Sequence, residues 1–277
     1  ATENTRIGTA VVPVFTRTPA VLASTFAVIN QAYPGRFIPG LGTSSHAIIN
    51  NWHGLTMEKP LTRIKETMTL LRSMMAGEKT NFEGEILRSK GYRQAPTSNQ
   101  PIYLAGLRPN MLETAAEISD GVILNLFPRS ALPKIMEHIA IGAERAGKDP
   151  ASVEVVCRHM MCLTNDKELG RAAFRAAFGP YYATPVYNKF LAWAGHEDTA
   201  KEIAEGFKAR DRERTSAAMT DELVDQIALI GNEAECQDLI REYAAGGIHT
   251  HVMAPMIPDP QMIENTVMAF SKERFSF

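Results

Sequence analysis

Short apolar segments alternate with longer segments of helical periodicity along most of the 277-residue chain. This order is typical of βαβ units around a parallel sheet. We find no point where the pattern resets as it would at a domain boundary. The sequence therefore predicts an α/β fold of the barrel type, with residues 1–277 as a single domain, rather than a doubly wound sheet. About six strands are expected, in the segments Arg6–Val12, Phe37–Leu41, Pro101–Ala105, Gly121–Leu126, Val153–Leu163 and His249–Ala254.

Helices are expected between these strands. Pro19–Tyr33 and Pro109–Ser119 each begin with proline, which favours the first position of a helix. Pro60–Met75 has apolar residues at steps of three and four, as an amphipathic helix requires. The remaining helical segments lie near Ala131–Ala146, through a long region that ends at about Ala245, and from about Gln261 onward.

Insertions interrupt the alternation near residues 44–60, 80–97 and 179–220. The segment Asn81–Pro96 has the glycines and alternating residues of a small hairpin. The charged run KARDRERT in the last insertion indicates a solvated helix face. Its aromatic residues either pack the insertion onto the main domain or cover a site, and the sequence leaves both roles open. These residues are Tyr181, Tyr182, Tyr187, Phe190 and Trp193.

The charge balance excludes some classes of partner. Lys and Arg number 29 and Asp and Glu number 31, a net charge of −2, which argues against binding to nucleic acid or to an anionic membrane surface. No apolar run reaches the roughly 20 residues that a membrane span needs. Cys157, Cys162 and Cys236 lack CxxC spacing, so we interpret them as reduced thiols of a cytoplasmic protein.

The loop after the second predicted strand, in FIPGLGTSSHAIINNWHG, has the composition of an anion site. Gly42 allows close backbone approach, and Thr43, Ser44 and Ser45 provide hydroxyl and backbone donors suited to a phosphate. A dinucleotide fingerprint would need a third glycine where Ser45 stands. Alternatively, Gly40 and Gly42 only relieve packing at the end of the strand.

A second loop, LAGLRPNM, has a similar character. It leads from a strand through Gly106, Leu107 and Arg108 into a helix, and so places free N–H groups and one guanidinium at a helix N-terminus. The alternative is that Arg108 is a surface residue whose stem covers Leu107.

The histidines offer candidates for acid–base chemistry and metal binding. His53 is a candidate acid or base. The alternative is that the WHG segment only fixes its own loop, with Trp52 packing and His53 satisfying backbone carbonyls. His249 and His251 share one face of a strand, a spacing that can support a metal. No third ligand is evident, so we favour structural roles for them and predict no metal site.

Three segments carry a resemblance to a known family. They are RIGTAVVPVFTRTPAVLASTFAVINQAYPGRFIPGLGTSS, EKPLTRIKETMTLLRSMMAGE and PIYLAGLRPNMLETAAEISDGVILNL. They resemble the bacterial luciferase-like superfamily, and within it the oxidoreductases that depend on the deazaflavin coenzyme F420. The resemblance implies a (β/α)8 TIM barrel, usually dimeric, with the cofactor at the C-terminal face of the strands.

The resemblance also assigns cofactor-binding residues. It implies a cis peptide bond between Ala10 and Val11 under the ring system. It implies that the loop from Gly42 to Ser45, with Thr43 and Ser44, approaches the ribityl and phosphate part, as do Gly106, Leu107 and Arg108. A side chain at Gly42 would then project into the cofactor's space. Catalytic residues stay unassigned apart from the candidate His53.

The implied function is hydride transfer between coenzyme F420 and an organic small-molecule substrate. The alternatives are an FMN-dependent monooxygenase of the same superfamily and a flavin-binding protein without turnover. The implied assembly is a homodimer. In the family, two strands and a helix precede the segment that matches RIGTAVV, which begins at Arg6 here. We therefore expect an incomplete or atypically closed barrel, in which Ala1–Val12 is poorly ordered or paired with a second chain.

Overall fold

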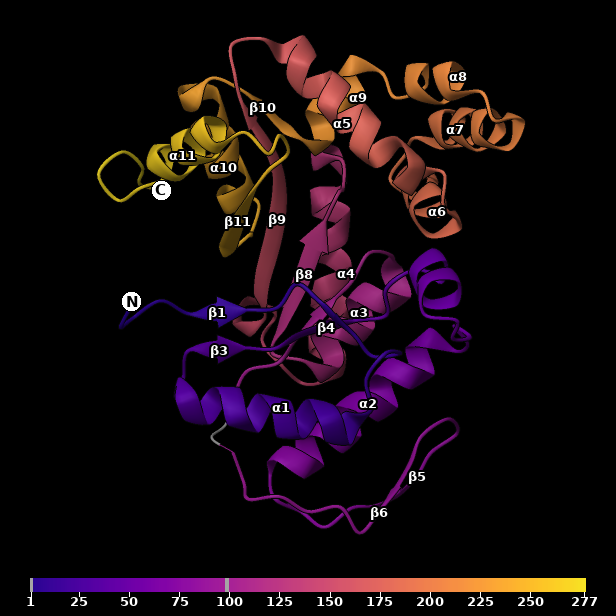
Figure 1. Ribbon diagram of the computed structural model, residues 1–277, viewed down its shortest axis with the longest axis vertical. Helices are drawn as coiled ribbons and strands as arrows, with labels where there is room; N and C mark the ends of the chain where they lie inside the picture. Colours follow the sequence, from indigo (N-terminus) through magenta and orange to yellow (C-terminus); the bar gives the residue numbers. More distant parts are fainter. Residues whose placement is uncertain (1, 98–99) are drawn as a thin grey trace. The chain divides into compact units, whose positions relative to one another are not determined.

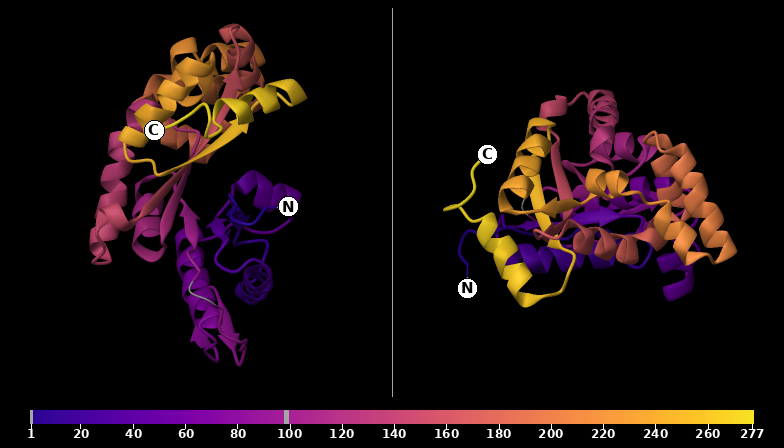
Figure 2. Two further views of the ribbon diagram at one scale, coloured as in Figure 1. Left: turned by 90° about the vertical axis from the view of Figure 1, so that its left-hand side faces the viewer. Right: turned by 90° about the horizontal axis from the view of Figure 1, so that it is seen from above.

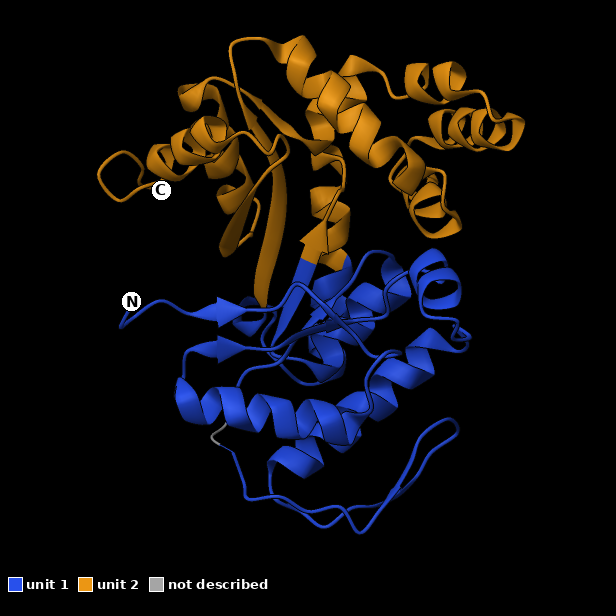
Figure 3. Ribbon diagram, in the orientation of Figure 1, with its two compact units in different colours: residues 1–123, 138–153 blue, residues 124–137, 154–277 orange. Residues whose placement is uncertain are grey.

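The computed structural model describes residues 2–97 and 100–277. The chain divides into two compact units, one of residues 1–123 with 138–153 and one of residues 124–137 with 154–277 (Figure 3). Each unit contains parallel strands that are followed by helices, which confirms the predicted α/β class. The assignment of residues 1–277 to one domain stays a prediction. Ala1, the first residue of the predicted mobile or partner-bound segment, lies outside the described residues.

The first unit is built on short parallel strands. β2 pairs with β4, β4 with β7, and β7 with β8, while β1 pairs with β3. These strands are β1 (Ile7–Gly8), β2 (Val12–Pro13), β3 (Phe37–Ile38), β4 (Gly40–Gly42), β7 (Tyr103–Ala105) and β8 (Gly121–Asn125), of which β8 continues into the second unit. Among the described residues, β2 is the last strand in this order.

The predicted strand Arg6–Val12 is in fact two strands with a break at Thr9–Val11. The Thr9 hydroxyl donates to the Gly40 carbonyl at 3.0 Å and accepts from the Gly40 N–H at 2.9 Å. The Thr9 side chain therefore hydrogen-bonds both backbone groups of Gly40, which would otherwise bond the backbone of a continuous strand. The break follows from this tertiary contact and not from any breaker residue in the sequence.

The helices of the first unit match the predicted segments closely. Three of them begin with proline, and the Thr18 hydroxyl also caps the first of these by accepting from the Val21 N–H. They pack their apolar faces against the strands, and α1 and α2 lie side by side (Figure 1). The helices are α1 (Pro19–Ala32), α2 (Pro60–Met75), α3 (Pro109–Ile118), the π-helix Ala47–Trp52, the 3-10 turn Pro150–Ser152 and the second half of α4 (Leu132–Arg145).

The hairpin predicted in Asn81–Pro96 is present as β5 (Asn81–Glu83) and β6 (Arg88–Lys90), which pair antiparallel. Its turn is attached to α2 by one carboxylate. Glu66 accepts hydrogen bonds from the backbone N–H groups of Glu85, Ile86 and Leu87, with N–O distances of 2.6, 3.1 and 2.7 Å. The turn therefore forms a small anion-binding nest that the protein fills with its own side chain.

The second unit is centred on the long strand β9 (Glu154–Leu163). β11 (Thr250–Pro255) pairs with its residues 156–161, and β10 (Leu229–Gly231) pairs with residues 161–163. Both pairings are parallel. The sequence predicted continuous helix through β10, which is wrong: three residues are too few to show a strand period, and only the pairing with β9 defines this strand.

Seven α-helices of the described residues complete this unit. Side-chain caps begin several of them, among them Asp166, and Asn232 with Glu235 in a capping box. They are α5 (Lys167–Tyr182), α6 (Pro185–Trp193), α7 (Glu197–Ala209), α8 (Arg212–Ala217), α9 (Asp221–Ile227), α10 (Glu233–Ala245) and α11 (Pro260–Ala269), with the turn Arg129–Ala131 and the first half of α4. In residues 2–97 and 100–277, none of the helices is both long and apolar enough to cross a bilayer.

The insertion at 179–220 corresponds to the end of α5 and to α6, α7 and α8, which lie together at the end of the unit opposite α11 (Figures 1 and 2). Tyr182 and Phe190 from this insertion are fully buried, so part of its aromatic content forms core. The Lys134 ammonium lies over the Trp193 ring as a cation–π pair, 4.4 Å from the ring centroid. The packing role predicted for the aromatics is confirmed for these residues.

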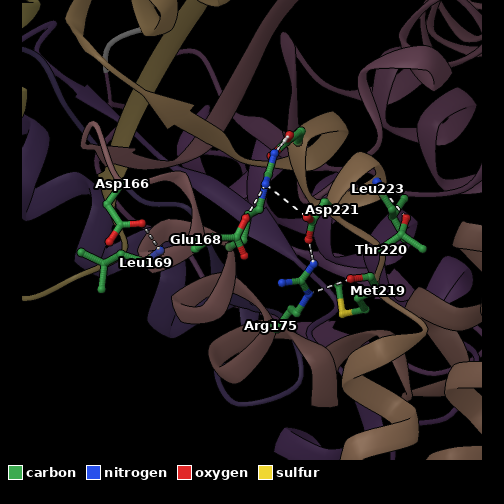
Figure 4. Close-up of polar contacts among 10 residues, drawn as sticks. Asp166, Glu168, Leu169, Arg175, Met219, Thr220, Asp221 and Leu223 are labelled. Atoms are coloured by element: carbon green, nitrogen blue, oxygen red, sulfur yellow. Dashed lines mark hydrogen bonds and ion pairs between the residues drawn. The ribbon is translucent and has the colours of Figure 1, made fainter.

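An ion-pair network joins α5 to α9. Arg175 donates to the Met219 carbonyl at 2.7 Å and pairs with Asp221 (Figure 4). Arg171, one turn earlier, contacts Glu168 and Asp221 and makes a two-point contact with Asp225. Two-point guanidinium–carboxylate pairs set orientation as well as distance, so the network fixes the angle at which α9 leaves the insertion.

Candidate functional site at the ends of the first-unit strands

The C-terminal ends of β2, β4 and β7 converge around Gly42. The strands are parallel, with Pro13 opposite Gly42 and Leu41 opposite Leu104, so their ends lie on the same edge of the sheet. A Cβ atom built on Gly42 would lie 2.7 Å from Val11 Cγ2 and 3.3 Å from Ala105 Cβ. Three segments that are far apart in the sequence therefore meet at one point, at the edge where parallel α/β folds place their ligands.

This geometry changes the interpretation of Gly42. We expected a side chain at this position to project into a ligand's space, but the missing side chain faces Val11 and Ala105 instead. The packing contact that the alternative requires is therefore present at Gly42. It is also present at Gly40, whose Cβ would overlap the Thr9 carbonyl oxygen. A ligand contact by the Gly42 backbone stays a prediction.

The segment before β2 has the backbone geometry that the resemblance implied. The peptide bond between Ala10 and Val11 is cis, although the second residue is not proline. Both residues are at least partly accessible, and Val11 Cγ2 is the atom that approaches Gly42.

The loop after β4 presents hydroxyl groups at this edge. Among the described residues, the Thr43 and Ser44 hydroxyls make no hydrogen bond, and both side chains are half-buried. Ser44 has a φ of 64°, a left-handed conformation that turns the chain sharply. Ser45 is partly engaged, because its hydroxyl accepts from the Ile48 N–H at 3.4 Å at the start of the π-helix. The loop therefore offers two free hydroxyls and a third that can still donate.

The rest of that loop does not form a closed site in the first unit. Trp52 is 77% exposed and His53 is exposed as well. The backbone N–H of His53 donates to the Ile48 carbonyl at 3.2 Å, which ends the π-helix. A packing role for Trp52 is thus wrong for this unit, and the acid–base role of His53 stays a prediction.

The loop after β7 leads into α3 as predicted. Arg108 is exposed and is the residue at which α3 begins, with Pro109 as the first helical residue. The glycine before it has a packing reason: a Cβ on Gly106 would lie 3.1 Å from Leu112 Cα, so α3 could not approach the strand as closely. The predicted alternative for Arg108, an exposed surface residue beside the half-buried Leu107, agrees with its exposure. Exposure at a helix N-terminus equally leaves the guanidinium free for an anion.

The histidines of the second unit make hydrogen bonds within that unit, and the structural roles favoured from the sequence stay predictions. His249 Nδ1 accepts from the Val155 N–H at 3.0 Å. His251 does not act together with His249. Its Nδ1 lies 3.0 Å from His159 Nε2, and His159 Nδ1 lies 3.7 Å from Cys157 Sγ. No group of three potential metal ligands occurs in the part of the chain that the structure describes.

Burial keeps this histidine pair neutral. It lowers the pKa of His159 to about 3, and the neighbouring His251 acts in the same direction. It lowers the pKa of His251 to about 4. With both rings neutral, the Cys157 thiol can donate to His159 Nδ1 and the His159 Nε2–H can donate to His251 Nδ1. The cluster is therefore a hydrogen-bonded part of the core beside Tyr243, whose ring centroid lies 4.6 Å from that of His159.

The sequence analysis missed two polar residues of the second unit, Asn125 and Arg158, and named a third, Tyr187, only among the aromatic residues of the insertion. Asn125 ends β8, Arg158 lies in the middle of β9, and Tyr187 lies on α6. The signals were visible but weak: a charge inside the apolar run VEVVCRHMMCL, and an amide at the end of GVILN. Nothing in the sequence indicated that residues so far apart would meet.

Comparison with known proteins identifies the family. The model of the luciferase-like monooxygenase family matches residues 1–250. A 5,10-methylenetetrahydromethanopterin reductase from Methanolobus tindarius is 31% identical over 263 residues, which cover 91% of this chain and 78% of that protein.

Solved structures agree on the fold. The coenzyme F420-dependent tetrahydromethanopterin reductase from Methanopyrus kandleri superposes with a TM-score of 0.79 at 21% identity, over 98% of this chain and 83% of that one. An F420-dependent secondary alcohol dehydrogenase, solved with an F420–acetone adduct, gives 0.78 at 18% identity, over 100% and 81%. The predicted luciferase-like, TIM-barrel type of fold is confirmed, and the chain belongs to the luciferase-like monooxygenase family.

Proposed function

We propose that the protein is an oxidoreductase that transfers a hydride between the deazaflavin coenzyme F420 and an organic small-molecule substrate. The relatives named above support this, because the Methanolobus protein is a reductase, and the solved tetrahydromethanopterin reductase and secondary alcohol dehydrogenase are F420-dependent. The observation that carries the proposal is the edge around Gly42, where unpaired hydroxyls and an exposed arginine surround three strand ends.

The residues at this edge fit a cofactor with a phosphate-bearing tail. Thr43 and Ser44 have hydroxyls without protein partners, and Arg108 is a guanidinium without an ion pair among the described residues. Hydroxyl donors, a guanidinium and a helix N-terminus are the groups that bind phosphate in proteins. A neutral, apolar ligand would leave these donor groups of the protein without hydrogen-bond partners.

When bound, F420 supplies a ring carbon that accepts or gives up a hydride. The chain's residues would bind and orient it. Thr43, Ser44 and Ser45 would donate hydrogen bonds to phosphate oxygens, and Arg108 would add a charge-assisted bond. The backbone of Gly42, Gly106 and Leu107 would border the tail, and Ala10 and Val11 would lie against the ring. This leaves the acid–base group unassigned, with His53 as its candidate.

Titration with F420 and with FMN tests the proposal. We expect F420 to bind at least tenfold more tightly than FMN, measured by the change in deazaflavin or flavin fluorescence. The reduced complex should be stable in air, because reduced deazaflavins react slowly with oxygen. Tighter binding of FMN with rapid reoxidation in air would replace our proposal by a monooxygenase, the activity in the family's description. Binding of either ligand without turnover of any substrate would favour a flavin-binding protein.

We also propose a homodimer in the cytoplasm. The resemblance implies a dimer, and α1 exposes Val21 and Val28, at 50% and 66%, on one helical face. The described cysteines are free and buried, which suits a reducing compartment. A single species of twice the chain mass in light scattering would support the dimer, and a monomer at micromolar concentration would refute it.

A further inference from the structure

The ladder between β9 and β11 has two unlike faces. Cys157, His159 and Met161 point to one face and are buried. The other face carries Arg158, which is partly exposed, and its ladder partner Val252, which is 38% exposed. Paired residues of a ladder point to the same side of a sheet, so this face presents a guanidinium next to an apolar side chain, between the buried Val156 and Met160.

Arg158 carries a charge without an ion-pair partner among the described residues. In residues 2–97 and 100–277 it makes no salt bridge and no side-chain hydrogen bond. Its neighbours in the strand, Cys157 and His159, are a buried thiol and a neutral ring. Arg158 is not among the described residues that have a buried side-chain nitrogen without a partner, so its guanidinium is accessible, and an oxyanion with two acceptor oxygens would pair with it.

Asn125 supplies a complementary group at the end of β8. Its side-chain Oδ1 is buried and has no hydrogen-bond partner in the described part of the chain. The same side chain also interacts with the Tyr187 phenol, whose pKa it acts to lower. An unmatched buried carbonyl oxygen costs free energy unless a donor reaches it, and the protein provides none.

Tyr187 is held in place from two sides. Its ring lies edge-on to Tyr181 and Tyr182, with centroid distances of 5.8 and 5.9 Å. Tyr182 is itself fixed, because its hydroxyl donates to the Leu126 carbonyl at 2.8 Å. Burial and Tyr181 raise the pKa of Tyr187, against the opposing effects of Asn125 and Arg158, so the phenol is neutral. Arg158 lies on β9, which is the neighbour of β8 in the sheet, and Asn125 ends β8.

We propose that Asn125, Tyr187 and Arg158 form a recognition site for an anionic substrate: a small organic molecule with a carboxylate or phosphate beside an O–H or N–H donor. Arg158 binds the oxyanion, Asn125 Oδ1 accepts from the donor, and Tyr187 orients the amide. This rests on the proposed function, since the bound molecule is the partner of the hydride transfer, and it narrows the substrate to anionic compounds.

Calorimetric titration with matched probes tests the site. Lactate and 2-propanol share a secondary alcohol and differ in the carboxylate, and inorganic phosphate distinguishes the two oxyanions. Each is titrated into the protein with and without saturating F420. We expect the wild type to bind lactate or phosphate at least tenfold more tightly than 2-propanol, and the preferred anion identifies the oxyanion class.

Variants assign the preference to these residues. Arg158→Met should lower the affinity for the preferred anion at least tenfold, and Arg158→Lys should lower it less. Asn125→Asp should also lower it at least tenfold, because the new carboxylate would pair with Arg158. Arg212→Met is the control, since Arg212 is an exposed arginine of the same unit, and it should change nothing. Circular dichroism checks that each variant is folded. If Arg158→Met does not fold, the affinity of Arg158→Lys for the preferred anion serves as the test instead.

The outcomes separate this inference from the proposed function. F420 affinity, measured by fluorescence, should be the same in all variants. Loss of the anion preference in the Arg158 variants supports the site even if the wild type does not bind F420, a result that would refute only the proposed function. Two results would overturn the inference. One is a wild type that binds F420 but has no preference for anions, and the other is an anion preference that survives in both Arg158 variants.

Discussion

Glu66→Gln should release the β5–β6 hairpin from α2. The carboxylate accepts from three backbone N–H groups, two of them at 2.6 and 2.7 Å. Hydrogen bonds to a charged group contribute roughly 1.5–3 kcal/mol each and neutral ones about 0.5–1.5. A glutamine amide also turns an NH2 group toward one donor. Because the site is partly exposed, we expect a net loss of about 2 kcal/mol, or about 30-fold in the local opening equilibrium.

Hydrogen exchange at pH 7 measures this opening. The amides of Glu85, Ile86 and Leu87 should exchange about 30-fold faster in Glu66→Gln, with α2 itself unchanged. Glu83→Gln is the control, because Glu83 lies on the same hairpin with a highly exposed side chain. Unchanged protection of the three amides in Glu66→Gln would refute the reasoning.

The same contact predicts a pH dependence. Burial acts to raise the pKa of Glu66, but the three backbone donors together outweigh it, and the pKa is lowered from 4.5. A carboxyl group whose pKa is lower in the folded than in the unfolded protein stabilises the fold at pH values above its unfolded pKa. This stabilisation is lost as the pH falls through its folded pKa. Protection of the turn, corrected for intrinsic exchange, should therefore be complete at neutral pH and be lost only below pH 4.5.

Three further predictions concern the two units. Arg108→Ala should weaken F420 binding about tenfold and leave a tail-less deazaflavin unaffected in fluorescence titrations; equal losses would remove Arg108 from the tail site. Gly42→Ala should cost about 1–3 kcal/mol in urea unfolding because of the 2.7 Å approach to Val11 Cγ2, and Val11→Ala in the same chain should restore part of it; no rescue would contradict the contact. The folded pKa of His159, about 3, lies below its unfolded value of about 6.5, so stability should fall as pH drops from 6.5 toward 4, and this decline should be smaller in His159→Leu; the same decline in both proteins would contradict it.

The sequence by itself determined the order and type of most elements. Local signals are responsible, because proline at the first position, Thr18 or Asp166 as a cap, and apolar residues at helical spacing act within a few residues of each other. The helix Pro60–Met75 was predicted with the bounds that the structure has. The first-unit edge was also predicted in outline, since it consists of loop residues that directly follow strands.

Only the tertiary structure decided the features that depend on distant partners. β10 is a strand because residues 161–163 of β9 pair with it, and the break at Thr9–Val11 exists because Gly40 lies opposite. Gly42 and Gly106 must be small because Val11 and Leu112 approach them from elsewhere in the chain. The second-unit site has the same origin. Asn125, Arg158 and Tyr187 come from three elements up to 62 positions apart, and a sequence pattern carries no information on which distant side chains meet once the chain has folded.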